Sequence, residues 1–66
     1  MVINKKKVSL IMAKKNMSQK DLANKSGIGR GNISNLLGGK SCLPRTVFRI
    51  ATALGVEIEE ILEDEQ

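Results

Sequence analysis

The chain has 66 residues, of which 41% are hydrophobic and 27% are charged, and it carries a formal net charge of +4. So short a chain buries only about 60% of its unfolded surface, which predicts one small domain with a marginal core. Without histidine, and with Cys42 as the one cysteine, neither a zinc cluster nor an internal disulfide is available.

The sequence also argues against an enzyme and against a membrane protein. No paired acids in a predicted cleft and no phosphate-binding loop motif are present, so we expect no cofactor and no metal. No apolar run approaches the ~20 residues of a transmembrane helix, and no signal-peptide pattern follows the basic start. We therefore expect a cytoplasmic protein.

The charges are divided along the chain. All eleven Lys and Arg residues lie between Lys5 and Arg49, whereas six of the seven acidic residues lie in the last ten positions. The segment up to Val56 contains Asp21 as its one acidic residue, which leaves a net charge of +10. This division indicates a surface for a polyanion, although ordinary solvated helix surfaces explain the charge alone equally well.

The first predicted helix begins at residue 4 or 5 and ends at residue 15, after a start over residues 1–4 that we expect to be frayed. Val8, Ile11 and Met12 recur at spacings of three and four residues, which is the pattern of a core-facing stripe. The lysines of the same segment are expected to remain in water.

Two short helices, over residues 19–25 and 29–37, are predicted on either side of Gly27. Ser18 precedes the first of them and Asp21 follows three residues later, at the spacing of a capping box. Gly27 stands where the chain must reverse within a few residues, which favours a positive φ. Such a pair of helices is a helix-turn-helix.

A loop over residues 38–43 follows, and Gly39 is expected to end the preceding helix in a left-handed conformation. Pro44 suits the first turn of a fourth helix that ends at residue 54. Apolar positions between residues 56 and 62 predict a short fifth helix, and residues 63–66 are expected to fray.

The chain contains one aromatic residue and one cysteine. Phe48 is the one aromatic residue, and it is expected in the core or at an interface, because a lone ring seldom forms a base-stacking platform. Cys42 is expected to be a small loop residue, with a redox switch as the less favoured alternative.

The segment SQKDLANKSGIGRGNISNLLGGK, residues 18–40, precedes a proline-started helix and the sequence ALGV. This pattern resembles the Cro/CI-type repressor family, also called the XRE family, and the resemblance extends from about residue 8 to residue 62. It implies an all-α, compact five-helix domain of the lambda-repressor type over residues 1–66, with its helix-turn-helix at about residues 19–37. It further implies sequence-specific binding of double-stranded DNA by a transcriptional regulator, most simply a repressor.

By correspondence with the family, the third helix enters the major groove and its principal base-reading positions are Arg30, Gly31 and Asn35. Arg30 suits guanine and Asn35 suits adenine, each through a bidentate pair. Gly31 has no side chain with which to read a base, so base recognition is expected to be sparse or to shift to Asn32 and Ser34. Without the resemblance these polar residues would form a solvated face, with Asn32 bonding the backbone near the helix start.

The resemblance also implies contacts with DNA phosphates at the start of the second helix and in the loop after the third. Free N–H groups and the helix dipole favour an anion at the first of these places. The alternative for all of them is a solvated surface. The predicted phosphate-binding residues are Ser18, Gln19, Gly38, Lys40, Ser41 and Arg45.

A weak homodimer that tightens on DNA is expected, because this motif commonly places two copies on major grooves about 34 Å apart. The alternative is that the apolar residues of the expected interface, together with Ile61, are buried within one subunit. The resemblance places the interface at Leu54, Gly55, Val56, Glu57 and Ile58.

The sequence departs from the family inside the core. The family often has an arginine at position 12 and a glutamate at position 37, where this chain has Met12 and Leu37. We predict that an apolar contact between them replaces a buried ion pair.

A different class of function also stays open, in which the same fold is a protein-binding module such as an antitoxin or antirepressor component.

Overall fold

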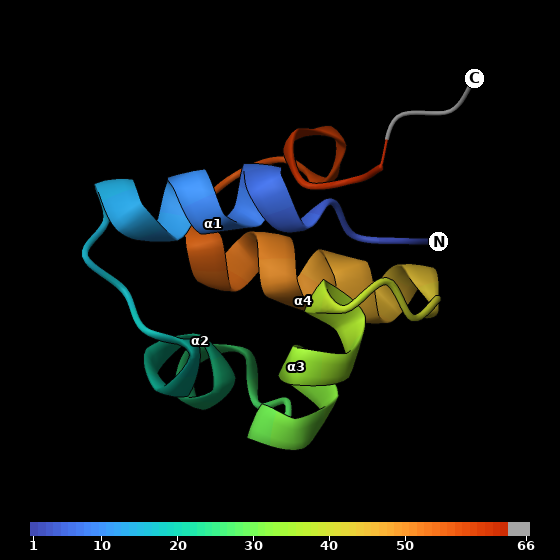
Figure 1. Cartoon of the computed structure of the whole chain (residues 1–66), viewed down its shortest axis with the longest axis horizontal. Helices are drawn as coiled ribbons and strands as arrows, with labels where there is room; N and C mark the ends of the chain where they lie inside the picture. Colours follow the sequence, from blue (N-terminus) through green and yellow to red (C-terminus); the bar gives the residue numbers. More distant parts are fainter. Residues whose placement is uncertain (64–66) are drawn as a thin grey trace.

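The structure, a computed structural model, describes residues 1–63 and contains four α-helices in that range (Figure 1). Their bounds lie within one residue of the four helices expected first along the chain. The helices are α1 (Lys5–Lys14), α2 (Gln19–Ser26), α3 (Arg30–Leu37) and α4 (Pro44–Leu54).

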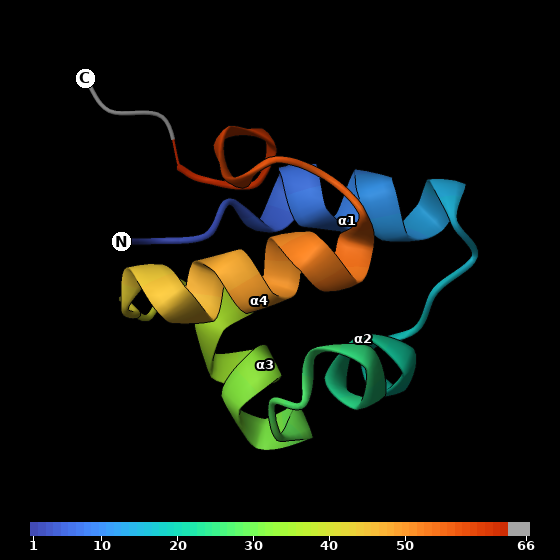
Figure 2. The ribbon, with the colours of Figure 1, turned by 180° about the vertical axis from the view of Figure 1, so that it is seen from behind.

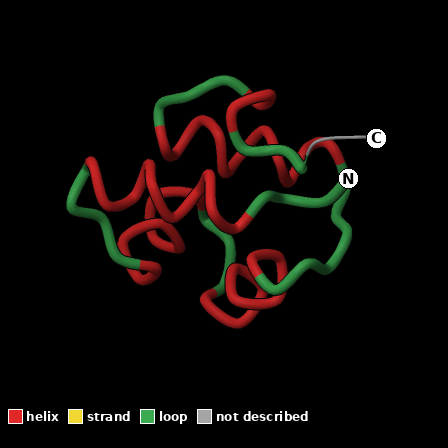
Figure 3. The backbone as a smooth tube through the Cα atoms, turned by 45° about the horizontal axis from the view of Figure 1, so that its top comes forward, coloured by secondary structure: helices red, strands yellow, loops and turns green. Residues whose placement is uncertain are grey.

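The predicted fifth α-helix is wrong. Instead, η1 (Ile58–Glu60) is a single turn of 3-10 helix, closed by a bond from the Glu57 N–H to the Glu60 carboxylate (2.8 Å). The chain leaves the helical conformation at once, because Leu62 pairs with Ile3 in an isolated antiparallel bridge. Figure 3 accordingly shows helices and loops, and no strand, over the part of the chain that is described.

The expectation of a frayed start over residues 1–4 is also wrong. The side chain of Ile3 is only 1% exposed, and the segment before α1 lies between the residues that follow η1 and the start of α4 (Figure 2). Fraying was also expected over residues 63–66, but Glu63 is bonded to Val2, and the last three residues lie outside the described residues. The backbone bonds that hold the segment run from Asn4 N–H to Ile61 O (2.8 Å), from Glu63 N–H to Val2 O (2.9 Å) and from Cys42 N–H to Met1 O (2.7 Å).

Helix α4 lies at the centre of the molecule. In Figures 1 and 2, α1 and η1 lie on one side of α4, and α2 and α3 lie on the other. Its buried stripe recurs at spacings of three and four residues, which is the pattern of a core-facing helix. The stripe consists of Val47, Ile50, Ala51 and Leu54.

The start of α2 and the turn after it have the predicted local structure. The Ser18 N–H donates to Asp21 Oδ2 (3.0 Å) and the Asp21 N–H donates to Ser18 Oγ (3.1 Å), which makes a complete capping box. Gly27 has a φ of +75°, in the left-handed region that glycine adopts without strain. The turn also depends on Ser26, a residue the sequence did not indicate: this buried hydroxyl donates to Ala23 O (3.4 Å) and accepts from the Ile28 N–H (3.2 Å).

Met12 and Leu37 belong to one buried hydrophobic cluster, in which each is 8% exposed. Their burial agrees with the replacement of an ion pair by apolar side chains, while the direct contact stays a prediction. No helix within residues 1–63 is both long enough and apolar enough to cross a bilayer.

Candidate nucleic-acid interface

Helix α3 has a buried face and an open face. Ile33, Leu36 and Leu37 are buried against the core. All five predicted base-reading residues are exposed on the remaining surface, and they are Arg30, Gly31, Asn32, Ser34 and Asn35.

The polar side chains of this open face are not used by the fold. Within residues 1–63, the side chains of Arg30, Asn32 and Asn35 make no hydrogen bond or ion pair. Gly29 is the N-cap of α3 and no side chain caps this end of the helix, so Asn32 does not have the capping role considered as the alternative. The donors and acceptors of all three residues therefore remain available to a ligand.

The end of α3 is a Schellman motif centred on Gly39, whose φ of +105° confirms the predicted left-handed stop. The Lys40 N–H donates to Asn35 O and the Gly39 N–H donates to Leu36 O, both at 3.2 Å. This turn places the loop over residues 40–43 beside the C-terminal end of α3. Gly38 has an ordinary helical φ of −79°, so its backbone conformation does not require glycine.

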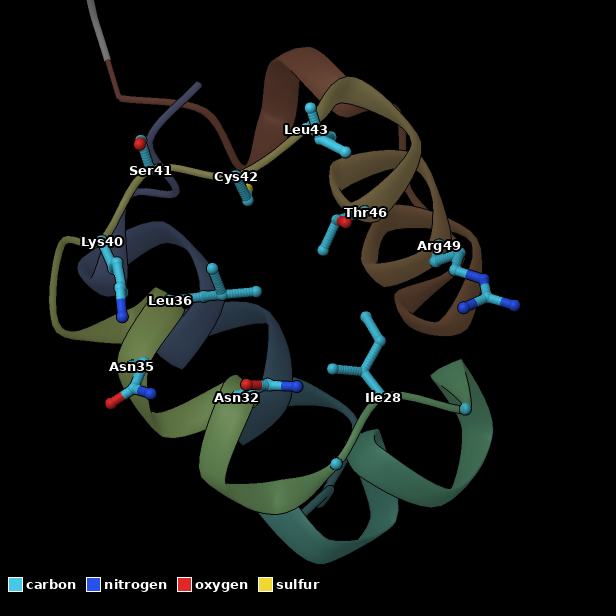
Figure 4. Close-up of a pocket in the computed structure, with 12 residues that line it drawn as sticks. Ile28, Asn32, Asn35, Leu36, Lys40, Ser41, Cys42, Leu43, Thr46 and Arg49 are labelled. Atoms are coloured by element: carbon cyan, nitrogen blue, oxygen red, sulfur yellow. The ribbon is translucent and has the colours of Figure 1, made fainter.

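A groove of about 420 Å³ lies between α3, that loop and α4 (Figure 4). Asn32 and Asn35 line it from α3, and Lys40 and Ser41 line it from the loop. The structure thus brings together two predicted base-reading residues and two predicted phosphate-binding residues. Arg30 and Arg45 are exposed but are not among its lining residues.

Three further residues border the same groove and have no role in the sequence-based site. They are Leu43, Thr46 and Arg49. Their spacing of three residues puts them on one side of α4 and its N-cap, and this spacing is the signal in the sequence that identifies them.

The start of α2 offers a second anion-binding position. Ser18 and Gln19 are exposed, and the first N–H groups of an α-helix have no partner within the helix. The capping box uses the Asp21 N–H, so the N–H groups of Gln19 and Lys20 remain for a ligand. The carboxylate of Asp21 lies at the same end of the helix and opposes the approach of an anion.

Cys42 has the properties of a structural residue. It is partly buried, and its N–H donates to Met1 O. Burial raises the pKa of the Cys42 thiol, which favours the protonated and weakly reactive form. This environment disfavours the redox alternative.

The expected dimer corner has less apolar surface than its sequence suggests. Leu54 and Ile61 are buried inside the subunit, while Val56 and Ile58 are half-buried. Phe48 was expected in the core or at an interface. It is 61% exposed on α4, so its placement in the core is wrong, and a role at an interface stays a prediction. The expected interface residues Gly55 and Glu57 are exposed.

The arrangement can hold a polyanion. Within residues 1–63, no three His, Cys, Asp or Glu side chains are placed to bind a metal ion. The groove lining contains two cations, Lys40 and Arg49, and no acidic residue.

Comparisons with known proteins relate the fold to one family. The sequence profile of the Cro/C1-type HTH DNA-binding domain matches residues 7–66. Comparison with curated proteins gives no significant match. Among solved structures, the restriction-modification controller protein C.AhdI from Aeromonas hydrophila is 26% identical, with a TM-score of 0.77 over 85% of this chain and 86% of that chain.

Two larger proteins contain a similar fold. A hydroxyethylphosphonate dioxygenase mutant has a TM-score of 0.85 at 24% identity, and PhpD has a TM-score of 0.84 at 23% identity. All of this chain is covered in both matches, but it spans only 14% of the length of each of those chains. At this identity the likeness shows the fold alone, and the dioxygenase activity belongs to the first of these proteins.

Proposed function

This chain belongs to the Cro/C1-type helix-turn-helix DNA-binding domain family, and we propose that it binds a specific DNA operator as a homodimer and represses transcription there. The observation that carries the proposal is the open face of α3. Arg30, Asn32 and Asn35 are exposed there, and no group within residues 1–63 bonds their side chains. Exposed polar side chains that are not bonded within the protein suit the reading of base edges.

In the proposed complex α3 lies in the major groove, whose width of ~12 Å admits a helix about 10–12 Å across. Arg30 donates to guanine O6 and N7, and Asn35 pairs with adenine N6 and N7. Each bidentate contact discriminates against the wrong base by ~1–3 kcal/mol.

Contacts with phosphates set the position of α3 on the duplex. One set comes from the first turn of α2, where Gln19 and Lys20 have free N–H groups. The other set comes from the exposed Lys40, Ser41 and Arg45, in the loop and at the start of α4. Such contacts supply affinity and orientation without reading sequence.

The size of the molecule supports the proposed dimer. The protein measures 31 × 22 × 18 Å, and its described part carries one helix-turn-helix, whereas successive major grooves are about 34 Å apart. Two copies are therefore needed to read two half-sites of a palindrome. We place their contact at Gly55–Ile58, where Val56 and Ile58 supply the apolar surface. A dimer seated on an operator represses by excluding RNA polymerase.

The first test is the selection of binding sites from a random duplex pool, followed by affinity measurements across a salt series. We expect an enriched palindrome that binds at least ~10³-fold tighter than scrambled DNA. Six or so phosphate contacts predict a slope of about −5 in a plot of log K against log salt, from roughly −0.9 per contact. Weak binding with no enriched sequence would contradict the proposal.

The second test compares Arg30→Ala with Lys14→Ala. Both side chains are exposed cations, but Lys14 lies on α1, across α4 from α3 (Figure 1). We expect Arg30→Ala to weaken binding to the selected site by about 5-fold to 150-fold, which corresponds to the ~1–3 kcal/mol of a base contact. Lys14→Ala should change affinity little. If reversal of charge at Arg30, Lys40 and Arg45 leaves DNA binding intact, the protein-binding alternative is favoured instead.

A further inference from the structure

Leu43 is the most exposed large apolar side chain in the described part of the chain, at 66%. It lies at the N-cap of α4 and borders the groove opposite Asn32 and Asn35 (Figure 4). Exposed single leucines are common on protein surfaces, so its exposure alone has no functional meaning. The informative feature of Leu43 is its fixed position among cations.

The backbone around Leu43 is held on both sides. Its carbonyl accepts the N–H groups of Thr46 (3.0 Å) and Val47 (3.2 Å), and the preceding Cys42 N–H donates to Met1 O (2.7 Å). Pro44 follows directly and restricts Leu43 to extended backbone, where its φ is −75° and its ψ is 153°. The side chain is therefore presented without the ordering cost that a flexible loop would add on binding.

The surroundings of Leu43 select the chemistry of its partner. The groove it borders is lined by Lys40 and Arg49 and by no acidic side chain, and Arg45 lies two residues further along the chain. An apolar contact in such a basic setting fits a partner that is anionic overall but has apolar C–H surface. DNA has this combination, in its deoxyribose rings and in the methyl groups of thymine.

We infer that Leu43 packs on the apolar surface of the bound DNA and contributes to its affinity. This inference rests on the proposed function, and it adds an apolar contact to a site otherwise made of polar and cationic groups. Because Leu43 carries no charge and so neutralises no phosphate, its contribution is independent of salt.

The test uses Leu43→Ala with Leu10→Ala as its matched control. Leu10 is the same residue type with nearly the same exposure, 64%, but it lies on α1, across α4 from α3. On the selected site we expect Leu43→Ala to raise Kd by about 5-fold to 30-fold, as expected for loss of most of one apolar side-chain contact. The salt slope should stay unchanged, and Leu10→Ala should stay within about twofold of wild type. Leu43→Met keeps the apolar volume and should retain wild-type affinity.

Replacement of thymine by uracil distinguishes the two apolar surfaces, because uracil lacks the methyl group. If Leu43 contacts a methyl group, replacing that particular thymine by uracil abolishes the difference in DNA affinity between wild type and Leu43→Ala. If Leu43 contacts deoxyribose, the difference persists at every uracil-substituted site and on scrambled DNA. Both outcomes support the inference.

Equal affinities of wild type, Leu43→Ala and Leu10→Ala on the selected site would overturn the inference and leave the proposed function intact. A wild-type protein that enriches no sequence would instead contradict the proposed function itself. Thermal melts of each variant confirm that the fold is kept, as expected for substitutions at such exposed positions.

Discussion

At the scale of single residues, the ionisation of Asp21 at the start of α2 makes the stability of the protein depend on pH. The hydrogen bond from the Ser18 N–H, followed by the Ser18 hydroxyl, lowers the pKa of Asp21 below its ordinary value of 3.8. A carboxyl group with a depressed pKa in the folded state stabilises the protein above the pKa of the unfolded chain. That stabilisation is lost as pH falls through the folded-state pKa.

We therefore predict that Asp21→Asn lowers the melting temperature at pH 7, where the ionised carboxylate accepts the Ser18 N–H. The difference from wild type should shrink as pH falls below about 4, because both proteins then carry a neutral group at this position. Thermal unfolding at pH 7 and at pH 2 to 3 measures this. A difference of the same size at both pH values would show that the charge of Asp21 has no part in it.

The packing of Met12 and Leu37 gives the second prediction at this scale. Both are buried in the core cluster, so Leu37→Glu places a carboxylate among apolar side chains and should lower the free energy of unfolding by ~3 kcal/mol or more. Met12→Arg combined with Leu37→Glu should recover part of the loss, because the two charges can then pair.

Denaturant unfolding of the single and double variants measures the coupling between the two positions. Leu37→Met is the control, since it keeps the apolar volume and should cost less than about 1.5 kcal/mol. An unchanged midpoint for Leu37→Glu would show that position 37 is not packed as the structure has it.

At the scale of elements, α3 combines strong tertiary support with weak intrinsic helicity. Its Ile33, Leu36 and Leu37 are buried, but Gly31 lies in its first turn and no side chain caps its start. A glycine within a helix is less favourable than alanine by up to ~1 kcal/mol. Packing against the core, more than local propensity, therefore holds α3 in place.

Two glycine substitutions separate backbone conformation from packing. A Cβ at Gly31 or at Gly27 meets no atom within 4 Å, but Gly27 has a φ of +75° and Gly31 is helical. We predict that Gly31→Ala raises the free energy of unfolding by about 0.4–1 kcal/mol. Gly27→Ala should lower it by about 1–2 kcal/mol, the cost of a left-handed conformation for alanine. Chemical denaturation measures the free energy of unfolding of both variants. Equal changes in the two would contradict the role assigned to the backbone conformation of Gly27.

At the scale of the whole molecule, the two ends of the described chain support each other. The bridge between Ile3 and Leu62, and the bond from Asn4 N–H to Ile61 O, close the fold over α4. A domain of 66 residues has a free energy of unfolding of about 3–10 kcal/mol, so each buried side chain matters.

We predict that Ile3→Ala lowers the free energy of unfolding by about 2–5 kcal/mol, a large part of the total. Leu10→Ala, at an exposed position, should change it by less than about 0.5 kcal/mol. Circular dichroism during denaturant unfolding measures both. Equal stability of Ile3→Ala and wild type would mean that residues 1–4 are frayed after all.

The sequence by itself determined the four α-helices to within one residue, the capping box of Ser18 and Asp21, and the left-handed conformations of Gly27 and Gly39. It also identified the polar residues that lie on the open face of α3. These features depend on neighbours within about one or two helical turns, so local spacing and local backbone chemistry are enough to predict them.

Only the tertiary structure decided the features that join distant parts of the chain. Ile3 pairs with Leu62, and the expected fifth helix becomes a 3-10 turn. The groove likewise exists only once α3, the loop and α4 have packed, which puts Leu43 across the groove from Asn35. Such contacts depend on which surfaces meet when the core forms, and the periodicity of a single segment holds no record of its distant partners.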